Sequence, residues 1–170
     1  MPSAGSSHDS LTKEMVAPVR AGLASAADMD SATPLKATIV GSYRKHFDRI
    51  WAVAEELRAL GVEVIRPASS TVIDASGPVV RLQGDPDDAA AIRDAQLAAI
   101  NASDFVYAVN TGSYLGDESV WDLGYANGRG KPTFLREPPL PGQEFARHSE
   151  GAASPVVAVE MLRARLGETV

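Results

Sequence analysis

Two acidic residues, Glu118 and Asp122, stand four positions apart in a segment with the pattern of a helix. Side chains at this spacing lie on the same helix face, so the two carboxylates are expected to be neighbours. Like charges at this spacing repel and mildly destabilise a free helix, so a functional role of the pair is considered. The alternative is structural, because acidic residues stabilise a helix start and Asp122 could face solvent. Gly124 costs about 1 kcal/mol in mid-helix, which indicates close contact with a neighbouring group.

A second polar group follows the first apolar run, at Gly41-Ser42-Tyr43-Arg44-Lys45. Gly41 allows a tight turn, and Ser42 can cap a helix or donate to an anion. Arg44 and Lys45 lie near the start of that helix, where the helix dipole favours negative charge. We expect a site for a small anion or a ribose here. The alternative is a capped helix with solvated basic residues.

A third group lies in the loop that precedes the helix of Glu118 and Asp122. Its glycines and small polar side chains let a ligand approach the backbone and offer several hydrogen-bond donors. The residues expected to contact a ligand there are Asn110, Gly112, Ser113 and Gly116. Asp94 and Gln96, on the helix predicted upstream, could reach the same crevice, although an exposed position is the default for Asp94.

The composition excludes several other kinds of site. The 170 residues include no cysteine, so a disulfide framework, a cysteine-ligated zinc and a thiol nucleophile are all excluded. The three histidines share no metal-like spacing, and no glycine-rich fingerprint of a dinucleotide or triphosphate site is present. We therefore expect neither a metal nor an organic cofactor. A net charge of −6 argues against a nucleic-acid partner.

The chain is expected to be a soluble, cytoplasmic protein without membrane contacts. No apolar run approaches the roughly 20 residues that span a bilayer, and no signal-peptide pattern opens the sequence. Residues 1–34 lack any sustained apolar period and predict a flexible N-terminal extension. Residues 35–170 are expected to form one domain, since 45% of the whole chain is apolar and the length suits a single core.

Strands and helices alternate along that domain. Apolar runs predict strands at 37–40, 62–65, 105–109 and 132–135, and helical spacing predicts helices at about 47–60, 86–101, 117–127 and 155–166. Two β-rich pieces within 71–82 flank Ser76-Gly77-Pro78 and predict a hairpin or flap. This alternation predicts an α/β fold with a single doubly wound parallel sheet and helices on both faces. Ligands bind such sheets beyond the carboxyl ends of the strands, where the strand order reverses.

The residues from about 36 to 135 resemble the nucleoside 2-deoxyribosyltransferase superfamily, which includes deoxynucleoside-monophosphate N-glycosidases and CMP hydrolases. The resemblance rests on Gly41-Ser42-Tyr43-Arg44, residues 100–108, Ser113-Tyr114-Leu115-Gly116, Asp122-Leu123-Gly124-Tyr125-Ala126 and Gly130-Lys131-Pro132. It implies that Asp122 stands at the position of the family's nucleophilic Glu. Gln96 stands where many members carry Asp.

The resemblance implies cleavage or transfer at the N-glycosidic bond of a nucleoside or nucleoside monophosphate. Asp122 would form a glycosyl-enzyme ester, and Asp94, Gln96 or Glu118 would assist departure of the base. Ser42, Arg44 and Lys45 would hold a 5′-phosphate, Tyr43 would offer a flat surface to the base, and Ser113 would assist at the sugar. Because Asp is one methylene shorter than Glu, either the pocket is built around it, Glu118 replaces it, or catalysis has been lost. The resemblance leaves open the base, the sugar, and transfer or hydrolysis.

Two other functions compete with this one. The first is a catalytically degenerate module of the same fold that binds or senses a nucleotide. The second is a phosphoribohydrolase of similar fold, which is disfavoured because its Pro-Gly-Gly-x-Gly-Thr motif is absent. Members of the family usually pair subunits, so the resemblance also implies a homodimer or larger homo-oligomer. The apolar residues of the C-terminal helix could pack on the sheet or across such an interface.

Overall fold

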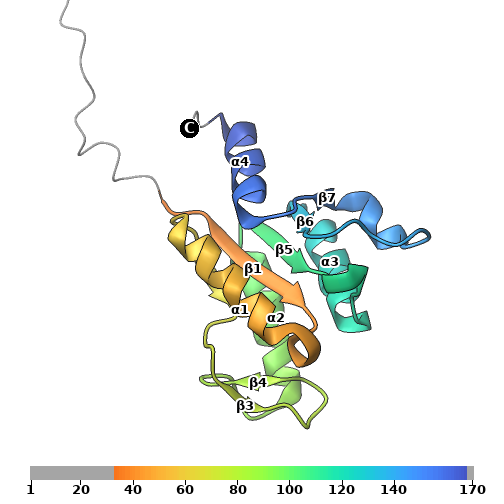
Figure 1. Cartoon of the computed structure of the whole chain (residues 1–170). Helices are drawn as coiled ribbons and strands as arrows, with labels where there is room; N and C mark the ends of the chain where they lie inside the picture. The colour runs from red at the N-terminus through yellow and green to blue at the C-terminus, as the bar shows by residue number, and fades with distance from the viewer. Residues whose placement is uncertain (1–32, 168–170) are drawn as a thin grey trace, which may run out of the picture. The chain divides into compact units, whose positions relative to one another are not determined.

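The structure is a computed structural model that describes residues 33–167. Its centre is a five-stranded sheet in the order β2-β1-β5-β6-β7, in which every neighbouring pair is parallel (Figure 1). The strands are β1 (Lys36–Gly41), β2 (Glu63–Arg66), β5 (Phe105–Val109), β6 (Thr133–Leu135) and β7 (Glu150–Gly151). The predicted extension over residues 1–34 lies outside the described residues, except for its last two positions.

The strand order reverses between β1 and β5. The chain moves from β1 outward to β2, then returns across β1 to build β5, β6 and β7 on the other side. This is the doubly wound arrangement that the alternating pattern predicts, and the prediction of the fold class is confirmed. The carboxyl ends of β1 and β5 therefore flank the position at which a ligand is expected.

Four helices cover the two faces of the sheet. They are α1 (Tyr43–Ala59), α2 (Ala89–Ala102), α3 (Asp117–Gly128) and α4 (Pro155–Leu166). Helices α1 and α4 contact each other and share one core cluster with the sheet. Helices α2 and α3 contact each other, and α3 shares a second core cluster with the sheet. All five residues of β5 are buried, as expected for a central strand covered on both faces.

Sequence signals at the helix ends agree with the structure. The side chain of Asp88 accepts a hydrogen bond from the amide of Ala91 at the start of α2. Ser154 caps α4 in the same way, Pro155 occupies the first turn, and Gly167 ends the helix in the left-handed conformation. Satisfying these end groups fixes where each helix begins, and so which of its side chains face the sheet.

The β-rich pieces within 71–82 form an antiparallel hairpin, as predicted, made of β3 (Val72–Asp74) and β4 (Arg81–Leu82). It is separate from the five-stranded sheet (Figure 1). Residues 71–76 are all exposed, whereas Val80 and Leu82 are buried and anchor the hairpin in the domain.

Gly124 does not have the close neighbour that the sequence suggested. It is exposed on α3, and no atom lies within 4 Å of the position that a Cβ would occupy. The expected tight contact is therefore wrong for the described part of the chain. Separately, none of the helices described between residues 33 and 167 is long and apolar enough to cross a membrane.

Candidate functional site

Two adjoining hollows lie at the carboxyl end of β1, at the point where the strand order reverses. The inner hollow has a volume of about 70 Å³, and the outer hollow has a volume of about 200 Å³. Residues from the end of β1, the hairpin and α3 line both: Gly41, Tyr43, Val79, Val80, Glu118 and Ser119. The inner hollow alone is far below the roughly 300 Å³ at which ligand sites begin, so a nucleoside would have to extend across both.

Asp122 lies in the inner hollow and is only 4% exposed. Its Oδ1 accepts a hydrogen bond of 2.9 Å from Nη2 of Arg93, and its Oδ2 accepts one of 3.2 Å from Nε2 of Gln96. Arg93 and Gln96 are one turn apart on α2, so they share the face that meets α3. The structural alternative, in which Asp122 faces solvent, is wrong.

Opposing effects act on the pKa of Asp122. Burial raises the pKa because it disfavours the charged form, and the guanidinium of Arg93, its hydrogen bond and the hydrogen bond from Gln96 lower it. Nearby Glu118 raises it further, and the net shift is upward. A carboxylate in this environment is less firmly ionised than one in water, and it is held in one orientation.

Glu118 lies on the same side of α3 as Asp122, at the mouth of the site. Its side chain is 59% exposed, and its Oε2 is 3.8 Å from Nη1 of Arg93. Arg93 therefore stands between the two carboxylates and contacts both. One carboxylate is buried and the other is open to solvent, which is the kind of difference that gives two carboxylates separate chemical roles.

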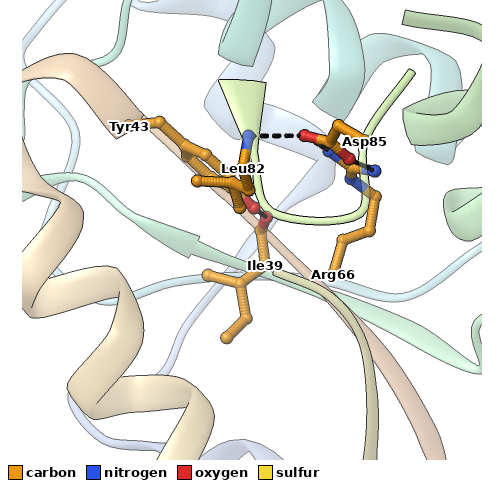
Figure 2. A network of polar contacts seen from close by, with 5 residues as sticks. All are labelled: Ile39, Tyr43, Arg66, Leu82 and Asp85. Carbon is orange, nitrogen blue, oxygen red and sulfur yellow. Dashed lines mark hydrogen bonds and ion pairs between the residues drawn. The ribbon is translucent and has the colours of Figure 1, made fainter. Parts of the chain in front are cut away.

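Tyr43, at the start of α1, lines both hollows. Its hydroxyl donates to the carbonyl of Ile39 at 3.1 Å (Figure 2). Burial raises the pKa of Tyr43 above its usual range, with smaller effects of Arg66, Asp122 and Asp85, so the phenol stays neutral. The ring is thus a fixed, uncharged surface beside Asp122.

The outer hollow contains two of the groups that were predicted to bind an anion. Ser42 and Arg44 line it together with Gly116 at the start of α3. Neither Ser42 nor Gly116 caps its helix through a side chain, so both helix starts keep amide groups available. Arg44 is exposed and donates through Nη2 to the carbonyl of Gly77 in the hairpin at 2.6 Å.

Several residues predicted for the site line neither hollow. Asp94 is exposed on α2, and the ammonium of Lys45 lies 3.9 Å from the centre of the Tyr114 ring. In the loop after β5, Asn110 exchanges hydrogen bonds with the backbone of Glu137, and the Ser113 hydroxyl donates to the carbonyl of Pro138. Gly112 lies between them in the left-handed conformation. Of that loop's predicted contacts, only Gly116 lines a hollow.

Three polar residues of the inner hollow were not predicted: Arg66, Arg93 and Ser119. Signals for them exist in the sequence. Arg66 ends the second strand, at the same sheet edge as Gly41. Arg93 precedes Gln96 by one turn, and Ser119 precedes Asp122 by one turn, so each shares a helix face with a residue that was predicted.

Arg66, which lines the inner hollow, forms a buried ion pair with Asp85 (Figure 2). Its Nη1 lies 2.8 Å from Oδ1 of Asp85, and its Nη2 lies 3.2 Å from Oδ2. The same Oδ2 accepts a hydrogen bond of 2.9 Å from the amide of Leu82 in β4. The pair therefore joins the end of β2 to the base of the hairpin, and it fixes the plane of the guanidinium.

The arrangement places a buried carboxylate and neutral or cationic donors around one small volume. Among residues 33–167, no group of three or more His, Cys, Asp or Glu side chains could hold a metal ion.

Comparisons with known proteins show a shared fold. No family model matches the chain, and no curated protein is significantly similar to it. A solved structure of a conserved protein from Enterococcus faecalis V583 matches with 14% identity and a TM-score of 0.55, over 78% of this chain and 99% of that one. The structure of the CMP N-glycosidase BcmB from Clostridium botulinum matches with 13% identity and a TM-score of 0.46, over 76% and 98%. At 14% identity the first similarity concerns the fold and leaves the activity open.

Proposed function

We propose that the two hollows bind a nucleoside or nucleoside monophosphate and that Asp122 cleaves its N-glycosidic bond. The observation that carries this proposal is the buried carboxylate of Asp122, which lines a hollow at the reversal of strand order. Carboxylates perform this chemistry at anomeric carbons. The resemblance of the Asp122-Leu123-Gly124-Tyr125-Ala126 segment to the family's nucleophile motif supports the same assignment.

In the proposed reaction, an oxygen of Asp122 attacks C1′ while the bond from C1′ to the base nitrogen breaks. The base leaves with the bonding electron pair and takes up a proton, and the sugar remains as an ester of Asp122. Water or a second base then attacks C1′, and the bond from C1′ to the Asp122 oxygen breaks and regenerates the carboxylate. The proton that the incoming nucleophile loses returns to the group that protonated the departing base. A carboxylate has about four lone-pair sites, so the bonds to Arg93 and Gln96 leave capacity for the attack.

Glu118 is the group we assign to the proton transfer. It lines both hollows, faces solvent, and lies on the helix that carries Asp122. Asp94 is excluded from this role by its exposed position outside both hollows. Gln96 is held by Asp122 and has no proton to give at neutral pH, so it orients the nucleophile.

The lining of the hollows suggests how the ligand lies. Val40, Val80 and Ile92 give the inner hollow apolar walls that suit a flat base. Ser119, at the junction of the two hollows, suits a sugar hydroxyl. In the outer hollow, Ser42, Arg44 and the starts of two helices would hold a 5′-phosphate, against the opposing charge of Asp117 and Glu118, which line the same hollow.

The test is release of free base from a panel of nucleosides and nucleoside monophosphates, measured by chromatography. Asp122→Asn keeps the shape of the side chain and removes the nucleophile, so it should lower base release about 10⁴-fold or more. Asp48→Asn, on the exposed surface of α1, is the matched control and should release base at the wild-type rate. Base release that survives in Asp122→Asn would contradict the mechanism.

A second candidate is a module that binds a nucleotide without chemistry. It is favoured by the engagement of both Asp122 oxygens with donors, which is also what a structural ion pair looks like. In that case nucleotides would raise the melting temperature of the protein, and no base would be released from any member of the panel.

A further inference from the structure

Arg93 contacts both carboxylates of the site from the facing helix. Its Nη2 donates to Oδ1 of Asp122 at 2.9 Å, and its Nη1 lies 3.8 Å from Oε2 of Glu118. Asp122 and Glu118 are one turn apart on α3, whereas Arg93 belongs to α2. A guanidinium has several donors in one rigid plane, so it can serve two acceptors at once.

The guanidinium of Arg93 is held between these carboxylates and an aromatic ring. Its central carbon lies 5.6 Å from the centre of the Trp121 ring, within the range of a cation–π contact. The side chain of Arg93 is 27% exposed, compared with 6% for Asp122 and 59% for Glu118. Arg93 therefore lies at the boundary between a buried carboxylate and an exposed one.

The other charged and titratable groups around Asp122 do not replace Arg93. Arg66 lines the same hollow from the end of β2, but Asp85 neutralises it. Tyr43, from the start of α1, stays neutral. Among residues 33–167, Arg93 is the one cation that forms an ion pair with Asp122.

Glu118 depends on the same cation. Arg44 and Asp117 line the outer hollow with it, but Asp117 is acidic and Arg44 donates to the carbonyl of Gly77 in the hairpin. Within the described part of the chain, the ion pair of Glu118 is again with Arg93. The two carboxylates therefore share one counter-charge.

We propose that Arg93 is a positioning residue that pairs with whichever of the two carboxylates carries the negative charge as the reaction proceeds. This inference rests on the proposed function and adds to it the balance of charge at that site. Before the attack, Asp122 is ionised and Glu118 holds the proton. As Asp122 bonds to C1′ and the bond from C1′ to the base breaks, the ester neutralises Asp122. The base takes the proton of Glu118, which is left ionised.

The negative charge thus moves from one partner of Arg93 to the other, and release of the sugar moves it back. Donors for both carboxylates are already on one guanidinium, so the charge is balanced in each step by a group that is in place beforehand. Without Arg93, a buried charge on Asp122 would be unbalanced before the attack, and a charge on Glu118 would be unbalanced after it.

Two measurements test the pairing without any need for activity. In the first, carbon-13 NMR follows the Asp122 carboxyl as the pH is changed. In Arg93→Gln the midpoint of this titration should lie about one pH unit or more above that of the wild type, as expected when an opposite charge at 4–6 Å is lost.

The second measurement is a crystal structure of Asp122→Asn, whose side chain is neutral, as it is in the ester. Arg93 should now pair with Glu118, so the separation of Nη1 and Oε2 should fall from 3.8 Å to a hydrogen-bond distance of about 3 Å. An Arg93 that stays in its place, with no closer approach to Glu118, would contradict the proposal.

A third measurement, kcat/KM for base release as a function of pH, connects the pairing to the reaction. In Arg93→Gln the acid side of the profile should move to higher pH by the same amount as the Asp122 titration. A purely structural effect would lower the rate equally at every pH. If Arg93→Gln does not fold, Arg93→Met, which keeps an apolar stem beside Trp121, is measured in the same way.

Arg58→Gln is the matched control. Arg58 also pairs with a glutamate, Glu55, and lies over a tryptophan ring, that of Trp51, but it lines neither hollow. This variant should keep the wild-type titration of Asp122 and the wild-type pH profile.

The possible outcomes separate this inference from the proposed function. An Asp122 titration or a pH profile that does not depend on Arg93 would overturn the inference and leave base release by Asp122 standing. The shifted titration and the closer pairing with Glu118, in a protein that releases no base, would support the shared counter-charge and contradict the proposed reaction. Absence of base release together with an unshifted titration would contradict both.

Discussion

The proposed reaction requires the charged form of the Asp122 side chain, whereas its buried environment disfavours that form. In the proposed reaction Asp122 must be ionised to attack, yet burial raises its pKa and Arg93 only partly offsets that effect. The competition between burial and Arg93 makes two measurable quantities depend on pH. One is the rate of base release, and the other is the stability of the fold.

The rate should fall as the pH is lowered through the raised pKa of Asp122, because a protonated carboxyl cannot attack C1′. The fall should begin above the ordinary aspartate value of about 3.9. The measurement is kcat/KM for base release as a function of pH, with circular dichroism at each pH to show that the protein stays folded. A rate that is constant down to about pH 4 would contradict the assignment.

The free energy of unfolding should change with pH in the direction opposite to the rate of base release. A folded-state pKa above the unfolded value means that the stability contributed by Asp122 is fully present below the unfolded pKa and is lost as the pH rises through the folded pKa. At pH 7 the charged side chain therefore costs stability. Asp122→Asn should unfold in urea with a free energy no lower than that of the wild type.

That measurement also separates a nucleophile from a structural ion pair. If Asp122 mainly neutralises Arg93, its loss should cost about 3 kcal/mol or more, as for a broken buried pair. Asp48→Asn, on exposed surface, serves as the control and should change the free energy by less than about 0.5 kcal/mol.

Local spacing explains which site residues could be predicted. Asp122 and Glu118 share a helix face, and that relation is visible in the sequence. The side chains of Asn110 and Ser113 instead bind the segment at Glu137 and Pro138, more than 20 residues away. Contacts at that separation depend on how β6 is placed beside β5, which no local pattern encodes.

At the level of elements, the end of β1 requires glycine for a reason that the structure makes explicit. A Cβ on Gly41 would lie 2.8 Å from the carbonyl oxygen of Val109 at the end of β5. The chain turns there from β1 into α1, beside the end of β5, and this turn places Ser42 and Tyr43 at the hollows. The close approach of the two strand ends leaves no room for a side chain.

Gly41→Ala should therefore lower the free energy of unfolding by about 2 kcal/mol, because one strand end must shift to relieve the contact. Gly124→Ala is the matched comparison. Its Cβ would meet no atom within 4 Å, and alanine favours a helix, so this variant should gain roughly 0.5–1 kcal/mol. Both are measured by urea unfolding. A loss in Gly124→Ala similar to that in Gly41→Ala would contradict the argument.

The apolar runs predicted four of the five parallel strands and the hairpin. The fifth, β7, has only two residues, Glu150 and Gly151, and neither is apolar. It pairs with β6 in parallel, and the hydroxyl of Thr133 in β6 also hydrogen-bonds to His148 and Ser149 just before it. Hydrophobic pattern therefore predicted the buried strands of the sheet and could not predict its edge.

At the level of the whole molecule, pairing of subunits remains a prediction. On α4, Ala158, Val159 and Leu162 pack into the core, whereas Val156, Val157 and Leu166 are exposed. Helix α4 therefore packs on the sheet, which is the first of the two arrangements expected for it. Its exposed apolar residues remain available for the second, a subunit interface. Subunit pairing in the family that the chain resembles makes a homodimer the expected state.

Sedimentation velocity should show a homodimer at micromolar concentration. Val157→Glu, at the exposed side of α4, should shift the equilibrium toward the monomer, because it places a charge on the apolar surface. Leu140→Glu, also on exposed apolar surface but outside α4, is the control and should leave the dimer unchanged. A wild-type protein that sediments only at the mass of a single chain would contradict the prediction.

The β3–β4 hairpin supplies Val79 and Val80 to the walls of the hollows but shares no strand pairing with the parallel sheet. Its tip can change in length or composition without disturbing a single hydrogen bond of that sheet. The part of the lining that the hairpin supplies can therefore vary without loss of the sheet's own hydrogen bonds. Directed evolution confined to residues 72–79 could diversify the accepted bases while the scaffold and its carboxylate stay constant.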